Sequence, residues 1–117
     1  MNKKQKGNFS EFFARCLLRL KGYMILEKNY VTGRGMGAGE IDIIAHKKKT
    51  IVFVEVKNRK SFKKALYALK KQQQQRIERA AEVYLAKHKK YQNDDVRFDV
   101  ILIGGLKVSH IPNAWMR

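Results

Sequence analysis

The sequence predicts one α/β domain, in which a mixed sheet of about five strands is flanked by helices. Its length of 117 residues suits a single hydrophobic core, so the whole of 1–117 is expected to be one domain. Two segments repeat apolar residues at helical spacing, and several short apolar runs bounded by turn residues are typical of strands. The order of these segments mixes helices with strands, which is the basis of the fold prediction.

Residues 9–21 are expected to form the first helix, with an apolar stripe that packs on the core. Asn8 and Glu11 suit the N-cap and N3 positions of a capping box, and Gly22 suits the C-terminal cap. Residues 1–7 are then left as a flexible basic tail. The stripe comprises Phe9, Phe12, Phe13, Cys16, Leu17 and Leu20.

The middle of the chain predicts three strands. Residues 23–31 form the first, and four glycines between 33 and 39 then form a loop whose spacing matches neither a P-loop nor a dinucleotide fingerprint. Residues 40–45 and 51–57 are expected to pair as a hairpin through the polar turn at 46–49.

The rest of the chain predicts a second helix and two more strands. Helical spacing runs from near Leu69 to His88, and an apolar strand follows at 96–103. Two glycines turn the chain into a last strand at 106–111. Asp99 could support the site or be a structural hydrogen-bond partner, and the structural role is favoured. Trp115 could stack on a base, but closing the core is favoured.

Charge is the strongest compositional signal. The chain has 26 Lys and Arg against 10 Asp and Glu, a net charge of +16, which exceeds the net charge of about 2 to 8 that suffices for solubility. Because the cations are spread along the chain and not confined to one amphipathic helix, nucleic acid is favoured over an anionic membrane as the partner.

The sequence disfavours membrane-spanning, disulfide-bonded and zinc-binding proteins. No run approaches the roughly 20 apolar residues that span a bilayer. A single cysteine, Cys16, cannot form an intramolecular disulfide, so we expect a cytoplasmic protein. The histidines, His46, His88 and His110, are too far apart for a zinc motif.

Two carboxylates interrupt the predicted hairpin. Alternation places Glu55 and Lys57 on one face of their strand, and an even turn would bring Asp42 beside Glu55, at roughly 4.5 to 5.5 Å between Cβ atoms. A divalent cation such as Mg2+ would relieve the repulsion, and Lys57 could orient an attacking water. The alternative is an ion pair between Glu55 and Lys57, or between Lys57 and Asp42, without any metal.

The segments Gly39-Glu40-Ile41-Asp42-Ile43-Ile44-Ala45 and Val52-Phe53-Val54-Glu55-Val56-Lys57-Asn58-Arg59 carry a resemblance. They resemble the YraN-like family of uncharacterised proteins, which is similar to archaeal-type Holliday-junction resolvases of the PD-(D/E)xK restriction-endonuclease-like superfamily. The resemblance extends to Glu11 on the first helix and to Arg97-Phe98-Asp99-Val100.

The resemblance implies that Asp42 and Glu55 ligate Mg2+ or Mn2+, that Lys57 assists the water, and that Glu11 completes an acidic cluster near the first helix. A helical wheel puts Glu11 opposite the aromatic stripe, which favours the capping role instead. At Gln73 this chain departs from a frequent family lysine. The residues expected to contact nucleic acid are Lys47, Lys48, Lys49, Arg59 and Gln73.

Together these observations predict a Mg2+-dependent endonuclease acting on DNA, and in particular on branched or structured DNA. The alternative is a binding module that keeps the fold and the basic surface without turnover. Resemblance to resolvases also implies a homodimer, although no residue demonstrates one.

Overall fold

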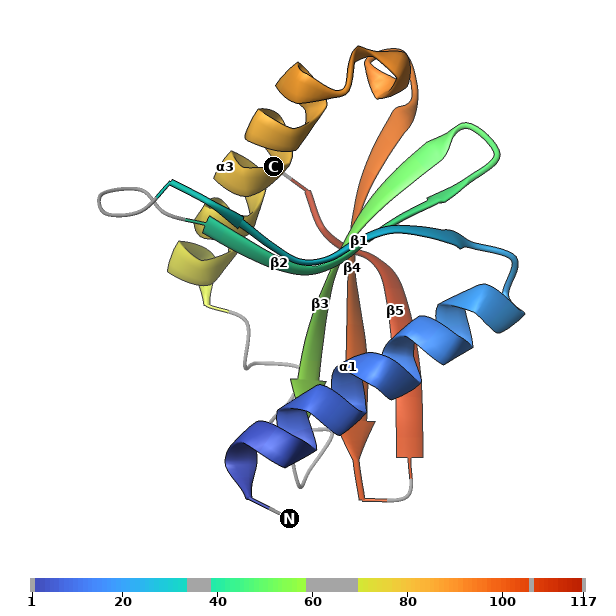
Figure 1. Cartoon of the computed structure of the whole chain (residues 1–117), viewed down its shortest axis with the longest axis vertical. Helices are drawn as coiled ribbons and strands as arrows, with labels where there is room; N and C mark the ends of the chain where they lie inside the picture. Colours follow the sequence, from blue (N-terminus) through green and yellow to red (C-terminus); the bar gives the residue numbers. More distant parts are fainter. Residues whose placement is uncertain (1, 34–38, 59–69, 106, 117) are drawn as a thin grey trace.

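In the computed structural model, residues 2–33, 39–58, 70–105 and 107–116 are described, and they form a five-stranded mixed sheet with helices packed on it (Figure 1). The strands lie in chain order across the sheet; β3 and β4 are parallel, and the other neighbours are antiparallel. The expected α/β class is therefore confirmed. The strands are β1 (Met24–Thr32), β2 (Gly39–Lys47), β3 (Thr50–Asn58), β4 (Asp95–Gly104) and β5 (Lys107–Trp115).

Helix α1 (Lys3–Leu20) begins six residues before the expected start. Asn2 is the N-cap, and a reciprocal capping box joins it to Gln5, so the expected box at Asn8 and Glu11 was wrong. Because this earlier box supplies partners for the first free N–H groups, residues 3–7 are helical and do not form a tail. Gly22, with a φ of +94°, ends the helix as expected.

The buried face of α1 is not the predicted aromatic stripe. Ser10, Ala14 and Leu18 face the sheet, whereas Phe9 and Phe12 are 54% and 55% exposed. Small side chains let the helix approach the strands closely, and this close packing decided the buried face. Cys16, which was expected in the core, is only half-buried.

The strands agree with their predicted positions to within one or two residues, except at the end of the chain. Lys48 and Lys49 form a two-residue hairpin turn, and Lys48 adopts a positive φ, so the turn is even as the site prediction requires. Strand β5 runs four residues beyond the expected end, through Pro112. An edge strand tolerates proline, because the missing N–H would have faced away from the sheet.

The sheet has a hydrophobic cluster on each face. Helix α3 (Lys71–Lys87) covers one cluster, and α1, which crosses in front of the strands in Figure 1, covers the other. A short 3-10 helix, η1 (Lys89–Tyr91), follows α3. Trp115 stacks on Phe98 in the α3 cluster, which confirms its place in the core. Ile41 joins the same cluster, whereas Ile43, two residues on in β2, belongs to the cluster under α1.

Asp99 is fully buried and links β4 to β5. Its carboxylate accepts hydrogen bonds from Arg97 and His110 and from the backbone N–H of Asn113, at the point where the register between the two strands shifts. Burial alone would raise its pKa, but the hydrogen bonds from His110 and Arg97 hold the pKa of Asp99 below the usual value. The structural role expected for Asp99 is confirmed.

Across the described ranges, no helix combines the length and the apolar character needed to cross a membrane.

Candidate functional site

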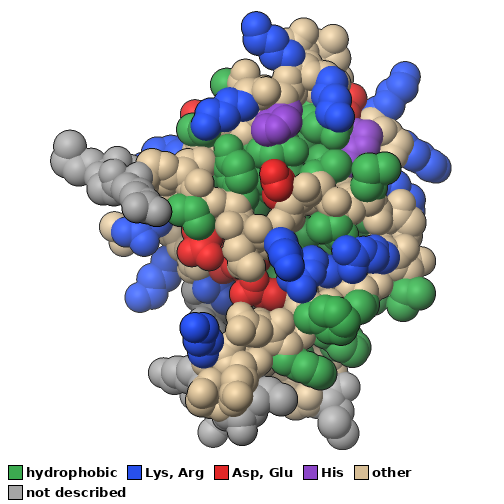
Figure 2. Space-filling view, viewed as in Figure 1, with side chains coloured by type: hydrophobic (Ala, Val, Ile, Leu, Met, Phe, Trp, Pro, Cys, Tyr) green, Lys and Arg blue, Asp and Glu red, His purple; other side chains and the backbone are tan. Residues whose placement is uncertain are grey.

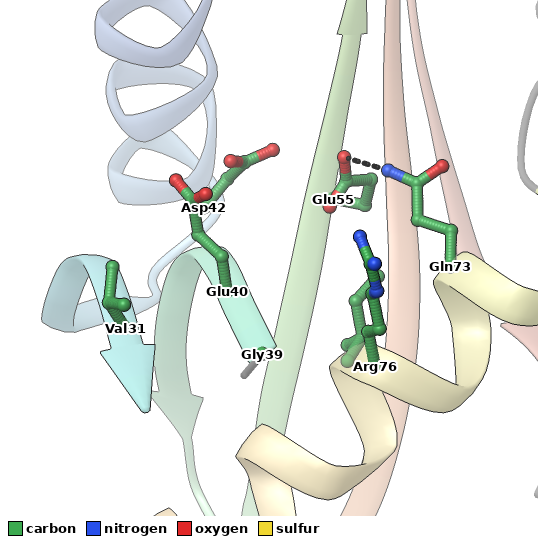
Figure 3. Close-up of a pocket in the computed structure, with 8 residues that line it drawn as sticks. Val31, Gly39, Glu40, Asp42, Glu55, Gln73 and Arg76 are labelled. Atoms are coloured by element: carbon green, nitrogen blue, oxygen red, sulfur yellow. Dashed lines mark hydrogen bonds between the residues drawn. The ribbon is translucent and has the colours of Figure 1, made fainter. Parts of the chain in front are cut away.

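A pocket of about 300 Å³ opens where β2 and β3 separate, and it is walled by the first turns of α3 (Figure 3). Asp42 and Glu55 enter it from the two strands, and Gln73 and Arg76 point toward Glu55 from the helix. The pocket is thus lined by α3, from which the sequence had indicated Gln73 but not Arg76 or Ile77. Its lining residues are Val31, Gly39, Glu40, Asp42, Glu55, Gln73, Arg76 and Ile77.

Asp42 reaches the pocket because the pairing between β2 and β3 ends at its neighbour, Ile43, and does not include Asp42. The last paired residues are Ile43 and Val54. Beyond them the Asp42 carboxylate accepts the backbone N–H of Val56 at 2.8 Å, in place of a strand partner. The even hairpin turn then puts Glu55 on the same side, so the expected meeting of Asp42 and Glu55 is found.

Glu55 is 7% exposed and has two protein partners besides Asp42. The Lys57 ammonium lies 3.3 Å from its Oε1 atom, and the Gln73 side-chain amide donates to the same oxygen at 3.0 Å. The ion pair between Glu55 and Lys57 that the alternative interpretation required is therefore present. Among the described residues, Lys57 is the cation that pairs with Glu55, and its charge also acts on Asp42.

Burial is the main cause of the raised pKa values of these two carboxyls. Burial, followed by the charge of Asp42, raises the pKa of Glu55 to about 8. Burial also raises the pKa of Asp42, although the hydrogen bond from Val56 and the charge of Lys57 lower it in part. Near neutral pH, Asp42 and Glu55 together therefore favour either a bound proton or an added cation.

Glu11 belongs to the same electrostatic environment. Burial raises its pKa to about 7, with further contributions from the charges of Asp42 and Glu40. The capping role is wrong, because the cap is Asn2. The charges of Asp42 and Glu40 act on Glu11, but among the described residues it does not join Asp42 and Glu55 in an arrangement that could hold a metal. Its expected part in an acidic metal-binding cluster stays a prediction.

Two residues that line the pocket were not among the predicted site residues. Glu40 lines it from the start of β2, and Arg76 lines it from α3. Positions three apart on a helix share a face, so the spacing of Gln73 and Arg76 could have indicated that Arg76 points to the same side as Gln73. For Glu40, the only signal in the sequence was its place in the hairpin motif, two residues before Asp42.

The lysines of the hairpin turn lie away from the pocket. Lys48 and Lys49 are exposed at the opposite end of β2 and β3 from Asp42 and Glu55. Lys47 donates to the Lys21 carbonyl at 2.7 Å, and its ammonium lies over the Tyr23 ring. Arg59 falls outside the described residues, and Gln73 contacts Glu55.

The donors of the pocket suit a hard divalent cation. Within the described part of the chain, no three or more Asp, Glu, His or Cys side chains converge in a metal-binding arrangement. Mg2+, however, is commonly held by one or two carboxylates, with water and phosphate completing its shell. Glu55, which is buried, and Asp42, which is partly buried, fit that requirement, and Mn2+ would suit the same oxygen ligands.

Fold and pocket together define a small α/β domain with a carboxylate pocket at the open end of a β-hairpin. The family model of the uncharacterised protein family UPF0102 matches residues 10–103, and the chain belongs to this family. A UPF0102 protein of Paramagnetospirillum magneticum is 44% identical over 95% of this chain and 87% of its own length. One from Rhodopseudomonas palustris is 40% identical, over 95% of this chain and 82% of the relative.

Proposed function

We propose that the protein is a Mg2+-dependent endonuclease that hydrolyses phosphodiester bonds in DNA, with branched or structured DNA as its substrate. The observation that supports this best is that the carboxylates of Asp42 and the buried Glu55 enter one pocket, where the raised pKa values of both favour a bound proton or cation. The net charge of +16 favours a polyanionic substrate. The resemblance of the hairpin motifs to the PD-(D/E)xK superfamily supports the same reaction.

Four residues in or beside the pocket have a role in this proposal. Asp42 and Glu55 hold the cation, which when bound would polarise the phosphate and acidify a water molecule. Lys57, 3.3 Å from Glu55, orients that water and stabilises developing negative charge. Arg76, which projects into the pocket from α3, contacts the phosphate of the substrate.

The competing function is a nucleic-acid-binding module without turnover. The ion pair of Lys57 with Glu55 and the hydrogen bond from Gln73 favour it, because both stabilise Glu55 without a metal. The two functions differ in whether the carboxylates are needed for chemistry.

Cleavage of labelled four-way-junction DNA and linear duplex DNA, each in Mg2+ and in EDTA, tests the proposal. We expect cleavage in Mg2+ alone, faster on the junction, and its loss in Asp42→Asn, which keeps an oxygen to accept the Val56 N–H. Asp95→Asn, at an exposed carboxylate at the start of β4, is the matched control and should cleave normally. Binding of DNA without cleavage in any divalent cation would favour the binding module.

A further inference from the structure

The outer surface of α1 exposes an aromatic patch, formed by Phe9, Phe12 and Phe13. The three side chains are 54%, 55% and 42% exposed. The rings of Phe9 and Phe13 lie 6.3 Å apart at 29°, so they present neighbouring faces and not a scatter of single rings. Contiguous exposed apolar surface on a small domain marks an interaction site.

The aromatic patch lies alongside the carboxylate pocket. Glu11, between Phe9 and Phe12 in the sequence, is close enough to Asp42 and Glu40 for their charges to raise its pKa. Ser10 accepts a hydrogen bond from Asn58 at the end of β3, the strand that carries Glu55. In Figure 2, exposed hydrophobic side chains lie beside the acidic side chains on the face that α1 crosses.

The helix that carries the aromatic patch is rich in cations. Glu11 is the sole acidic residue in the sequence of α1, which also carries Lys4, Arg15 and Arg19. The Arg15 guanidinium lies over the Phe12 ring, 5.9 Å from its centre. A second copy of this chain, with a net charge of +16, would bring like charge to this surface. The occupant that fits must combine flat apolar faces with negative charge.

Nucleobases on a phosphate backbone have both properties. Aromatic side chains stack on bases, and a base in a duplex hides its face against its neighbours, so such contacts require unpaired nucleotides. We propose that the aromatic patch stacks unpaired bases of a nucleic acid whose backbone runs toward the carboxylate pocket. This inference rests on the nucleic-acid substrate of the proposed function and narrows it to substrates with unpaired nucleotides.

Binding in EDTA tests the inference without any cleavage. The probes are a single-stranded DNA of about 20 nucleotides carrying 2-aminopurine and a duplex of the same sequence. In the triple variant Phe9→Ala, Phe12→Ala, Phe13→Ala, we expect single-strand affinity to fall about 10-fold or more and fluorescence quenching to disappear. Duplex affinity should change by less than about threefold, because backbone contacts carry it.

Two further variants separate stacking from apolar area. Replacing all three phenylalanines with leucine should lose single-strand binding as alanine does, whereas replacement with tryptophan should retain it. Val83→Ala, which removes exposed apolar surface from α3, is the matched control and should bind as wild type does. Thermal melts should show every variant folded, since the replaced side chains are exposed.

Several results would overturn the inference. If the alanine variant lost affinity equally for single-stranded and duplex DNA, base stacking would not be involved. Full single-strand binding by the leucine variant would have the same meaning. A wild-type dimer that the alanine variant dissociates, with single-strand binding unchanged, would assign the patch to a second copy. Failure of the nuclease proposal can be told apart from failure of this inference. In that case Mg2+-dependent cleavage is absent while single-strand binding persists.

Discussion

Burial gives Glu55 and Glu11 a titration behaviour opposite to that of an ordinary ion-paired carboxylate. Their folded pKa values, about 8 and about 7, lie above the unfolded value of 4.5. Between these limits the folded state binds more protons than the unfolded state, so the free energy of unfolding falls as the pH rises. These two groups therefore stabilise the fold below about pH 4.5 relative to pH 8.

We therefore predict that the metal-free protein loses thermal stability between pH 6 and pH 8.5, and that Glu55→Gln flattens this dependence. Melting curves in EDTA across the range provide the measurement. If the stabilities of wild type and Glu55→Gln changed equally between pH 6 and pH 8.5, the raised pKa of Glu55 would be contradicted.

The same residue separates the nuclease from the binding module. If Asp42 and Glu55 are joint metal ligands, Glu55→Gln relieves repulsion, so the metal-free protein should melt no lower than wild type and Mg2+ should no longer raise its melting temperature. If Glu55 serves only to balance Lys57, the substitution leaves an ammonium uncompensated, at a cost of about 3 to 5 kcal/mol.

Melts of wild type, Glu55→Gln and the control Asp95→Asn, each with Mg2+ and with EDTA, distinguish the two. The nuclease proposal would be abandoned if Mg2+ left the wild-type melting temperature unchanged while Glu55→Gln lowered it sharply.

The packing of β2 against α3 depends on Gly39. A Cβ atom there would collide with the Arg76 carbonyl oxygen and lie 2.9 Å from the Ala80 side chain. We predict that Gly39→Ala lowers the free energy of unfolding by about 1 to 3 kcal/mol, as overpacking of a close contact does. Since α3 must move, Gln73 and Arg76 should also leave the pocket, and cleavage should weaken.

Urea unfolding measures the effect, and Gly7→Ala is its matched control. Gly7 is inside α1 with open space around it, so alanine should stabilise the helix by about 0.5 to 1 kcal/mol. If both variants changed stability in the same direction, the close approach at Gly39 would not be the cause.

Helix α1 illustrates why an element can be predicted while its orientation is not. The apolar spacing of 9–21 correctly indicated a helix, but two faces of α1 could have packed on the sheet. The strands accept Ser10 and Ala14 at short range, and this preference depends on residues more than 20 positions away. Local periodicity carries no information about that partner.

The charge of the whole molecule makes a prediction of its own. About 5 or 6 phosphate contacts would give log K for nucleic-acid binding a slope of about −5 against log salt. Titrations between 50 and 200 mM salt measure the slope, and a flat response would remove the electrostatic argument. If the exposed turn lysines contact phosphate, Lys48→Gln with Lys49→Gln should reduce the slope by about 2.

The sequence by itself determined the α/β class, the order of the strands along the chain, and the hairpin that brings Asp42 to Glu55. These follow from periodicity, turn length and strand alternation, which are local properties. Only the tertiary structure decided that α3 walls the pocket with Arg76, that the charge of Asp42 acts on Glu11, and that Lys47 bonds to the Lys21 carbonyl. Those contacts join residues distant in the chain, and they form only where close packing of the helices on the sheet brings them within reach.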